Sequence, residues 1–322
     1  MKMKKMLSLI LAAVLVFALA ACGGSSAGKM TMGTGSPTGV YYAFGGVLGQ
    51  YIYNHAGISV TPVSSDGSKA NIESIAAGDY QLGFAQSDVI AYAWAGSRSF
   101  EQNGKVDSFR VVAGLYAEAV QLVTMDPAIQ SVADLKGKSV SIGAPGSGVY
   151  FNALDILTAA GLDLEDINAQ YLNFGASADG LKDGKIDAAF IVSGAPASDI
   201  TELCTTNDNA HLVPIDGDIA AKLMADHPFY TAYNIPAGTY NGQDADVATV
   251  TVKATLIVSA SASEEDVYNL TKAIFDNTSA IAAENGKGAE LSVENATSGM
   301  SAPFHAGAAK YFAEKGVTVD TE

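Results

Sequence analysis

The chain has few of the residues on which metal binding, disulfide pairing and anion binding commonly depend. Its 322 residues include two cysteines, Cys22 and Cys204, and one tryptophan. Arginine occurs only at Arg98, in a polar loop, and at Arg110, where a strand is expected to begin. The four histidines, at positions 55, 211, 227 and 305, show no spacing typical of metal ligands. We therefore predict no metal site, and no arginine that pairs with a ligand carboxylate in a cleft.

The common signatures of catalysis are absent as well. The residues around Ser147 do not form the G-x-S-x-G motif of a nucleophilic serine, because Pro145 and Val149 occupy the two glycine positions. No Walker A motif is present, and Thr38 stands where a dinucleotide-binding fingerprint needs its third glycine. No nucleophile has a visible base. We therefore predict that the protein is not an enzyme and uses no cofactor.

The N-terminal residues predict export. Three lysines among the first five residues precede an apolar run over residues 7–19, which suits a secretion signal and is too short to span a membrane. Residues 19–24, Leu-Ala-Ala-Cys-Gly-Gly, resemble the bacterial lipobox, in which the cysteine carries the lipid. We predict a lipoprotein signal peptide over residues 1–21, lipidation of Cys22, a flexible tether over residues 22–29, and an extracytoplasmic location at the cell membrane.

The remaining chain is strongly acidic. It keeps 15 basic residues, after three lysines of the signal are removed from 18, against 34 acidic ones, a net charge of −19. Such a surface does not attract nucleic acid. With Cys22 acylated, Cys204 has no partner for an internal disulfide and is expected to be a small core residue.

One stretch, residues 33–42, organises the rest of the chain. A short strand precedes it, and apolar residues recur at helical spacing after it. Ser36 is a good N-cap, Pro37 suits the first helical position, and Gly57 is expected to end the helix. A strand, a glycine-rich turn and a helix N-terminus together present free N–H groups and the positive end of a dipole. This predicts an anion site.

The same pattern occurs a second time. Gly148-Val149-Tyr150-Phe151 echoes Gly39-Val40-Tyr41-Tyr42, and each echo is followed by a similar helix end and strand, at residues 76–86 and 182–192. Chance is the alternative explanation, because glycine and alanine are abundant. The matching order favours two similar α/β lobes, each presenting a glycine-rich turn.

Alternating strands and helices predict a mainly parallel sheet that is covered on both faces. We place a break in the strand run at residues 116–119 and a return of the chain along residues 247–258. We therefore predict lobe 1 over residues 30–116 and 249–322 and lobe 2 over residues 117–248. Two crossings between lobes suit hinge closure around a cleft.

The turns after the strands offer a few polar groups among aromatic walls, as small-molecule clefts do. Taken singly, each serine or threonine is better explained by a local cap or turn, but together they are more than turns require. Glu118 and Asp88 each have two explanations, a partner for a ligand ammonium or a solvated charge. Helix N-termini at residues 36–40 and 147–150 could hold a ligand carboxylate.

Several motifs in order carry a family resemblance over residues 30–317. They are Gly33-Thr34-Gly35-Ser36 with Gly39-Val40-Tyr41-Tyr42, Ser65-Asp66-Gly67-Ser68, Gln86-Ser87-Asp88, Gly146-Ser147-Gly148, Ile235-Pro236-Ala237-Gly238 and Pro303-Phe304-His305. The chain resembles the TAXI family, the solute-binding subunits of TRAP transporters. The resemblance implies a type II periplasmic-binding-protein fold with two α/β lobes, a hinge and an interlobe cleft. It also implies delivery of a glutamate-, glutamine- or 2-oxoglutarate-like ligand to an ion-gradient-driven TRAP permease in the membrane.

The resemblance also implies ligand contacts at matching positions. These positions are Thr34, Gly35, Ser36, Tyr41, Gln86, Asp88, Ser147, Gly148 and Val149. The argument from turns adds Tyr116, Glu118 and Ala195. The alternative functions are an ABC-type substrate-binding lipoprotein for sulfonates or thiamine-precursor-like ligands, and a ligand sensor or surface antigen without a transport role.

Overall fold

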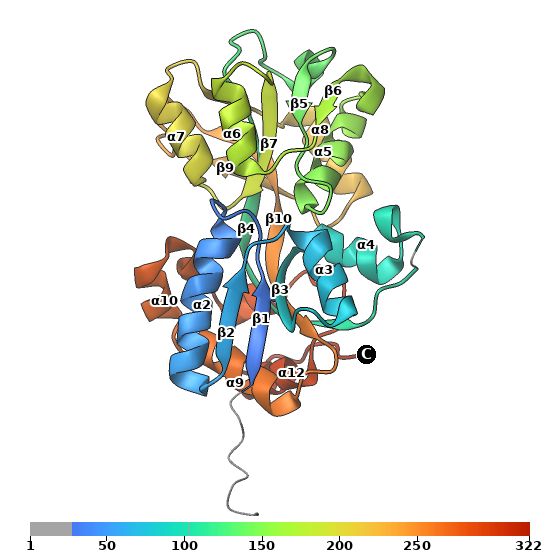
Figure 1. The fold of residues 1–322 in the computed structure, drawn as a ribbon, viewed down its shortest axis with the longest axis vertical. Helices are drawn as coiled ribbons and strands as arrows, with labels where there is room; N and C mark the ends of the chain where they lie inside the picture. Colours follow the sequence, from blue (N-terminus) through green and yellow to red (C-terminus); the bar gives the residue numbers. More distant parts are fainter. Residues whose placement is uncertain (1–27, 103) are drawn as a thin grey trace, which may run out of the picture.

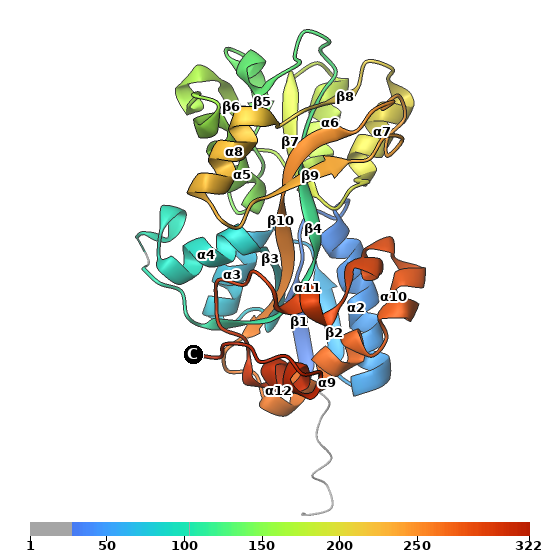
Figure 2. The same ribbon diagram turned by 180° about the vertical axis from the view of Figure 1, so that it is seen from behind.

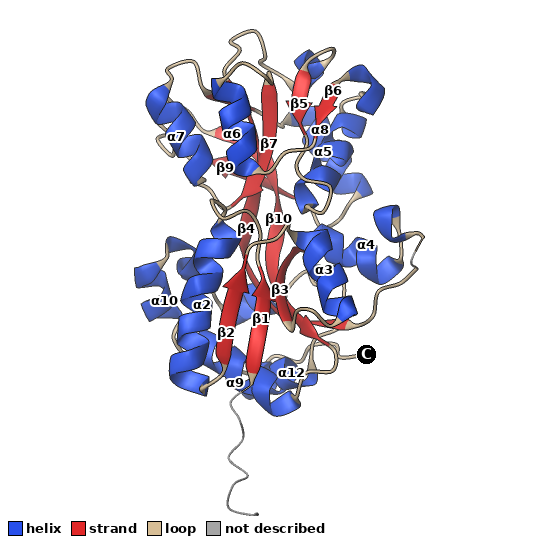
Figure 3. Cartoon of the chain, in the orientation of Figure 1, coloured by secondary structure: helices blue, strands red, loops and turns tan. Residues whose placement is uncertain are grey.

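The computed structural model describes residues 28–102 and 104–322 as two lobes stacked end to end (Figure 1). The predicted signal peptide, the lipidation site Cys22 and most of the tether lie outside these residues. Helices flank the strands on both sides in each lobe (Figure 3). Two long strands run through the middle and belong to both lobes (Figure 2). In the part of the chain that is described, no helix is long and apolar enough to cross a membrane.

The described strands form one sheet in the order β2-β1-β3-β10-β4-β7-β5-β6, with β8 on β4 and β9 on β10. The outer pairs in each lobe are parallel, whereas every pair that includes β4 or β10 is antiparallel. The sheet is therefore mixed, and not mainly parallel as the alternation of elements predicted. The strands are β1 (Lys29–Gly33), β2 (Ser59–Val63), β3 (Leu82–Gln86), β4 (Phe109–Thr124), β5 (Ser139–Ser141), β6 (Asn168–Gln170), β7 (Ala188–Ser193), β8 (His211–Val213), β9 (Thr231–Ile235) and β10 (Val247–Ser259).

Lobe 1 combines helices from both ends of the described chain around one apolar core. They are α2 (Val40–Ala56), α3 (Ser68–Ala77), α4 (Ser87–Ala95), α9 (Glu264–Phe275), α10 (Thr278–Glu284), α11 (Val293–Thr297) and α12 (Ala306–Glu314), with short 3-10 turns η1 (Arg98–Phe100) and η4 (Gly286–Glu290). Phe44, Phe84, Phe109 and Phe312 are all fully buried in its core. The C-terminal helices thus complete the lobe that the N-terminal strands begin.

Lobe 2 has two apolar layers, one on each face of β7. Phe190 and Val192 pack into one layer, and Ala189 and Ile191 pack into the other. Successive side chains of a strand point to opposite faces, so this alternation is what a strand covered on both sides requires. The helices of lobe 2 are α5 (Gly148–Ala159), α6 (Phe174–Lys182), α7 (Ser198–Thr206) and α8 (Gly217–Asp226), with 3-10 turns η2 (Val132–Leu135) and η3 (Leu164–Asp166).

The crossing between the lobes differs from the prediction of a break at residues 116–119. Strand β4 continues through this region for 16 residues, and its register against β10 shifts where Leu115 is skipped. Side chains from the C-terminal part of lobe 1 bond the irregular backbone there, because Asn295 donates to the Leu115 carbonyl and Glu290 accepts from the Ala117 N–H. A β-bulge with these partners bends the strand without ending it. The predicted boundaries at 116/117 and 248/249 fall inside β4 and β10.

Local signals located several helix ends. Gly57 ends α2 in the left-handed conformation, with φ of 71°, as predicted. Ser147 and Ser263 cap α5 and α9, and each accepts a hydrogen bond from a backbone N–H. The prediction for Ser36 was wrong, since α2 begins three residues later with Gly39 as its N-cap. The Gly39 N–H bonds the Ser36 carbonyl, so Pro37 occupies a turn position that proline favours as strongly as a helix start.

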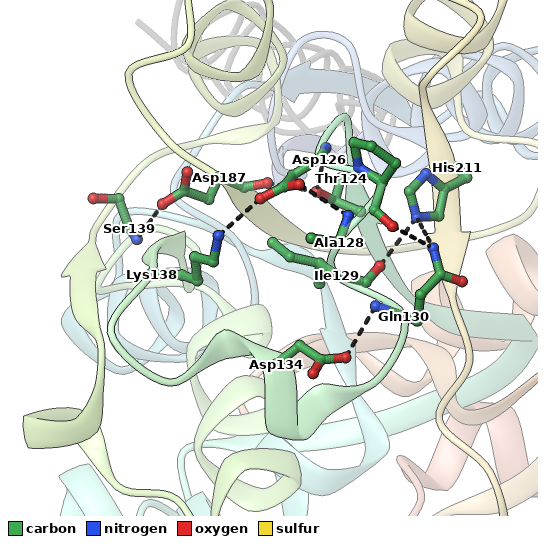
Figure 4. A network of polar contacts seen from close by, with 11 residues as sticks. Thr124, Asp126, Ala128, Ile129, Gln130, Asp134, Lys138, Ser139, Asp187 and His211 are labelled. Carbon is green, nitrogen blue, oxygen red and sulfur yellow. Dashed lines mark hydrogen bonds and ion pairs between the residues drawn. The ribbon is translucent and has the colours of Figure 1, made fainter.

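The far edge of lobe 2 carries a polar network in addition to its apolar packing (Figure 4). Lys138 pairs with Asp126 at 2.8 Å, and the Ser139 N–H donates to Asp187. The His211 ring nitrogen Nε2 lies 3.1 Å from the Ile129 carbonyl oxygen. Among the described residues, His211 belongs to no group of side chains that could hold a metal ion. These contacts fasten the loop after β4 and explain His211 structurally.

Candidate ligand-binding cavity

A cavity of about 50 Å³ lies between the two lobes. Residues of both lobes form its wall, and most of them lie in turns or at helix N-termini. The lining residues are Gly35, Ser36, Gly39, Val40, Tyr41, Ser65, Asp66, Gly67, Ser68, Gln86, Glu118, Gly143, Ala144, Ser147, Gly148, Val149, Leu172, Asn173, Phe174, Val192 and Ser193. A space of this size suits a small ligand held between the lobes.

Four helix N-termini converge on the cavity. Helices α2 and α3 of lobe 1 begin at its wall, and α5 and α6 of lobe 2 begin opposite them. The first N–H groups of a helix have no acceptor within the helix, and the dipole makes this end positive. The repeated glycine-rich phrase of the sequence corresponds to α2 and α5, one from each lobe. An oxyanion would meet donors from both sides here.

Glu118 places a carboxyl group in the same cavity. Its side chain comes from β4, is 2% exposed, and accepts a 2.6 Å hydrogen bond from the Tyr41 hydroxyl. Burial raises the pKa of Glu118 to about 8, while the hydrogen bond from Tyr41 opposes the rise. A cation held against this carboxyl would return it to the charged form.

Gln86 provides an unused acceptor beside Glu118. The residue is 3% exposed, and no group in the described chain bonds its side-chain oxygen. A buried carbonyl oxygen without a donor is unfavourable by about 1–3 kcal/mol. A ligand that donates a hydrogen bond would remove this penalty. No lysine, arginine or histidine is among the lining residues of the described chain, so donors other than N-terminal N–H groups have to come from hydroxyls, Asn173 or the ligand.

The lobes touch across the cavity. The Ala70 N–H bonds the Gly146 carbonyl at 3.1 Å, and the Ser198 hydroxyl bonds the Thr38 carbonyl at 2.6 Å. Gly148 lies so close to Gln86 that a Cβ added to it would meet the Gln86 side-chain oxygen at 1.8 Å. The structure is therefore the closed arrangement of the two lobes.

Eight of the predicted contacts line the cavity. They are Gly35, Ser36, Tyr41, Gln86, Glu118, Ser147, Gly148 and Val149. Four others, Thr34, Asp88, Tyr116 and Ala195, are not among the lining residues.

Each of those four residues has another environment. The Thr34 hydroxyl bonds the Val63 carbonyl at 2.6 Å, which joins β1 to β2. Tyr116 is buried in lobe 1 against Phe44, and Ala195 packs in an apolar layer of lobe 2. Asp88 points to Asn152 of lobe 2.

Sequence reasoning also missed some of the wall. Ser68 was not among the predicted ligand contacts, yet it lines the cavity, and its hydroxyl accepts from the Gln86 N–H at 3.1 Å. Asn71 is a supporting residue, because its amide bonds the Thr34 and Phe84 carbonyls and so joins the ends of β1 and β3. A lone asparagine on the apolar side of a short helix was the available signal.

The fold is shared with solved structures at low sequence identity. A protein from Bordetella bronchiseptica RB50 is 16% identical, with 88% of each chain covered and a TM-score of 0.54. A putative L-cystine ABC transporter from Listeria monocytogenes is 17% identical over 82% of this chain and 98% of that one, with a TM-score of 0.51. PhnD1 from Prochlorococcus marinus, in complex with methylphosphonate, is 12% identical over 77% and 84%, also with a TM-score of 0.51. These likenesses confirm the predicted α/β fold of the periplasmic binding proteins.

The sequence profile of the NMT1-like family matches residues 32–316. This match corrects the assignment to the TAXI family of TRAP solute-binding subunits. The motifs at residues 33–36 and 146–148 that carried the assignment form the turns of the cavity wall, so they report the architecture and not the class of transporter. The chain belongs to the NMT1-like family.

Proposed function

We propose that the protein is an extracytoplasmic solute receptor that captures a small amino acid between its lobes and delivers it to an ABC-type permease. The observation that carries the proposal is the closed cavity, which combines helix N-termini from both lobes with a buried carboxyl group and an unpartnered amide oxygen. Hinge closure along β4 and β10 would enclose the ligand. The protein is then a binding protein and not an enzyme.

The ligand class follows from donors and acceptors. Helix N-termini supply donors for a carboxylate, and Glu118 and the Gln86 oxygen supply acceptors for an ammonium group. An amino acid carries both groups, whereas an oxo acid, a sulfonate or a phosphonate brings no ammonium. Phe174, Leu172 and Val192 provide apolar wall for the rest of the ligand.

Two further features support an exported receptor. The N-terminal lysines, apolar run and lipobox-like residues favour secretion and a lipid anchor on Cys22, which keeps the receptor near its permease. The similar structure from Listeria is described as a putative L-cystine ABC transporter, which agrees with an ABC-type partner and an amino-acid ligand.

A second ligand class has a specific observation in its favour. Four convergent helix N-termini suit any small oxyanion, and the similar PhnD1 structure holds methylphosphonate. Against this class, an oxyanion leaves Glu118 and the Gln86 oxygen without a donor from the ligand.

A thermal-shift panel on refolded protein tests the proposal. Matched pairs isolate the ammonium group: glutamate against 2-oxoglutarate, and leucine and glutamine against methanesulfonate and methylphosphonate. At about 100 times Kd, a ligand adds about 2.7 kcal/mol, which shifts Tm by several degrees. We expect a shift with at least one amino acid and none with its oxo acid.

Other results would contradict specific parts. Equal shifts with glutamate and 2-oxoglutarate would remove the role of the ammonium group. Shifts only with methylphosphonate or methanesulfonate would replace the amino acid with an oxyanion. Turnover of any bound ligand, followed by NMR, would overturn the receptor assignment itself.

A further inference from the structure

A second buried polar cluster joins the lobes at one flank, away from the cavity. It lies where α4 of lobe 1 meets α5 of lobe 2, and the two helices are neighbours in both ribbon views (Figures 1 and 2). Its central residues are Asp88 on α4 and Asn152 on α5, both fully buried. Neither residue lines the ligand cavity. The cluster is therefore a contact between lobes with its own chemistry.

Some polar atoms of the cluster are hydrogen-bonded and others are not. The Asn152 amide donates to one Asp88 oxygen, Oδ2, at 2.9 Å and to the Tyr230 hydroxyl at 2.9 Å. Two oxygens remain. The second carboxyl oxygen of Asp88, Oδ1, and the amide oxygen of Asn152, Oδ1, are buried without a hydrogen-bond partner in the described chain. Two acceptors that face no donor destabilise a buried contact. A proton on the Asp88 carboxyl removes a buried negative charge that these contacts leave poorly compensated.

A second carboxyl group, that of Asp155 on α5, belongs to the same cluster. Asp155 pairs with Arg98, and the hydroxyls of Tyr92 and Tyr230 donate to it at 2.9 and 3.1 Å. His227 approaches Asp155 at 3.7 Å. Asp155 therefore has a guanidinium and two hydroxyl groups as partners.

The backbone N–H groups of Val89 and Asp88 lie near the Asp88 carboxyl and favour its charged form, but burial and the charge of Asp155 outweigh them. Asp155 and, from β4, Glu118 are the carboxyl groups that interact with it electrostatically, and its contact across the lobes is the neutral amide of Asn152. Unlike surroundings can give two neighbouring carboxyl groups different pKa values.

We propose that Asp88 carries a proton when the lobes are closed, so that closure takes up a proton from solvent at this flank. The inference rests on the proposed function only in that closure is the event by which a ligand is captured. The proton is bound to a contact between lobes and not to the ligand. Separation of α4 from α5 would expose Asp88 to water and release it.

The direction of the pH dependence follows. Burial, and next the charge of Asp155, raise the pKa of Asp88 to about 8 in the closed structure. In an open molecule the carboxyl returns towards its ordinary value of about 3.9. Between these values the closed form holds one more proton than the open form. The ratio of closed to open molecules is thus expected to fall about tenfold for each pH unit towards 8.

The test uses purified ligand-free protein at pH 5–9.5. Carbon-13 NMR of aspartate carboxyl groups should show one carboxyl that titrates near pH 8 in the wild type and is missing in Asp88→Asn. Small-angle X-ray scattering should show a larger radius of gyration at pH 9.5 than at pH 6. Asp88→Asn keeps a neutral side chain opposite Asn152 at every pH, so its radius should change less with pH than that of the wild type, with Glu118 as the remaining buried carboxyl between the lobes. Asp79→Asn, an equal change of charge at an exposed site of lobe 1, should behave as the wild type.

Two results would overturn the inference. One is an Asp88 carboxyl that titrates below pH 5 in the wild type. This titration is measured on the wild-type protein, and the Asp88→Asn variant serves only to assign the NMR signal. The other is an Asp88→Asn protein whose radius changes with pH as the wild type does. Neither measurement involves a ligand. A receptor with no amino-acid ligand would leave the inference standing, and an amino-acid receptor with pH-independent closure would refute the inference alone.

Discussion

Glu118 and Asp88 are both buried carboxyl groups with a pKa raised to about 8, yet they differ in what they face. Glu118 accepts from Tyr41 and borders the empty space between the lobes. Asp88 contacts Asn152 of the opposite lobe and borders no such space. The sequence analysis gave both residues the same two explanations, a ligand contact or a solvated charge. Their surroundings separate them into a ligand site and a contact between lobes.

The difference teaches that burial alone does not identify a binding residue. A carboxyl group beside a cavity can be neutralised by a ligand, so its protonation reports binding. A carboxyl group packed against a second lobe can be neutralised only by a proton, so its protonation reports closure. Four predictions test this distinction.

The largest expected effect comes from Gly148→Ala. Its Cβ would meet the Gln86 side-chain oxygen at 1.8 Å, so the buried Gln86 side chain must move from its position in the cavity wall, while the helical backbone of Gly148 accepts alanine. We expect the affinity for the amino acid found in the panel to fall at least about 100-fold, or about 2.7 kcal/mol, by calorimetric titration. Gly46→Ala is the control, since nothing lies within 4 Å of its Cβ position on exposed α2. Unchanged binding in Gly148→Ala would place the ligand elsewhere.

Glu118→Gln separates the two carboxyl groups directly. Loss of the charged partner of a ligand ammonium is expected to weaken amino-acid binding by about 1.5–3 kcal/mol, or about 10- to 100-fold. Asp88→Asn, measured by the same titration at pH 6, should bind as tightly as the wild type, because Asp88 is protonated there in the closed form. Weaker binding in Asp88→Asn than in Glu118→Gln would reverse the roles assigned to the two residues.

The pH dependence of unfolding should reflect both groups. A carboxyl whose pKa is raised by folding binds its proton more tightly in the native state, so its contribution to stability is lost as pH rises from about 4 to about 8. We expect the free energy of unfolding, measured with urea, to fall by up to about 1.4 kcal/mol per pH unit for each group. The double variant Glu118→Gln with Asp88→Asn should be nearly flat over this range. A wild type that gains stability from pH 5 to 8 would contradict both pKa directions.

The smallest effect compares the two glycine-rich turns. Ser147 caps α5 by accepting from the Tyr150 N–H, whereas the Ser36 hydroxyl contacts only Thr38 and caps no helix. Ser147→Ala should lower the free energy of unfolding by about 1 kcal/mol, and Ser36→Ala by less than about 0.5 kcal/mol. Equal losses in urea unfolding would mean that the turns are equivalent after all.

Much of the fold was predictable where the signal is local. Gly57 has no side chain to oppose a positive φ, so the end of α2 was identified correctly, and the helix N-terminus expected at residues 147–150 is that of α5, which Ser147 caps. Ser36 failed because Ser-Pro begins a turn as readily as a helix, and only the observed bond from Gly39 to Ser36 decides between them. The break placed near Leu115 failed because Asn295 and Glu290, remote in sequence, support the bulge.

By itself, the sequence determined the α/β class of the fold, the end of α2 at Gly57 and the glycine-rich turns that precede α2 and α5. Those properties depend on spacing, capping and backbone freedom, which act over a few residues. Only the tertiary structure decided that Gln86 faces Gly148 across a cavity, that Glu118 meets Tyr41, and that Asp88 meets Asn152, 64 residues away. Burial and the identity of a distant neighbour set the charge of a carboxyl group, and neither is written in the residues beside it.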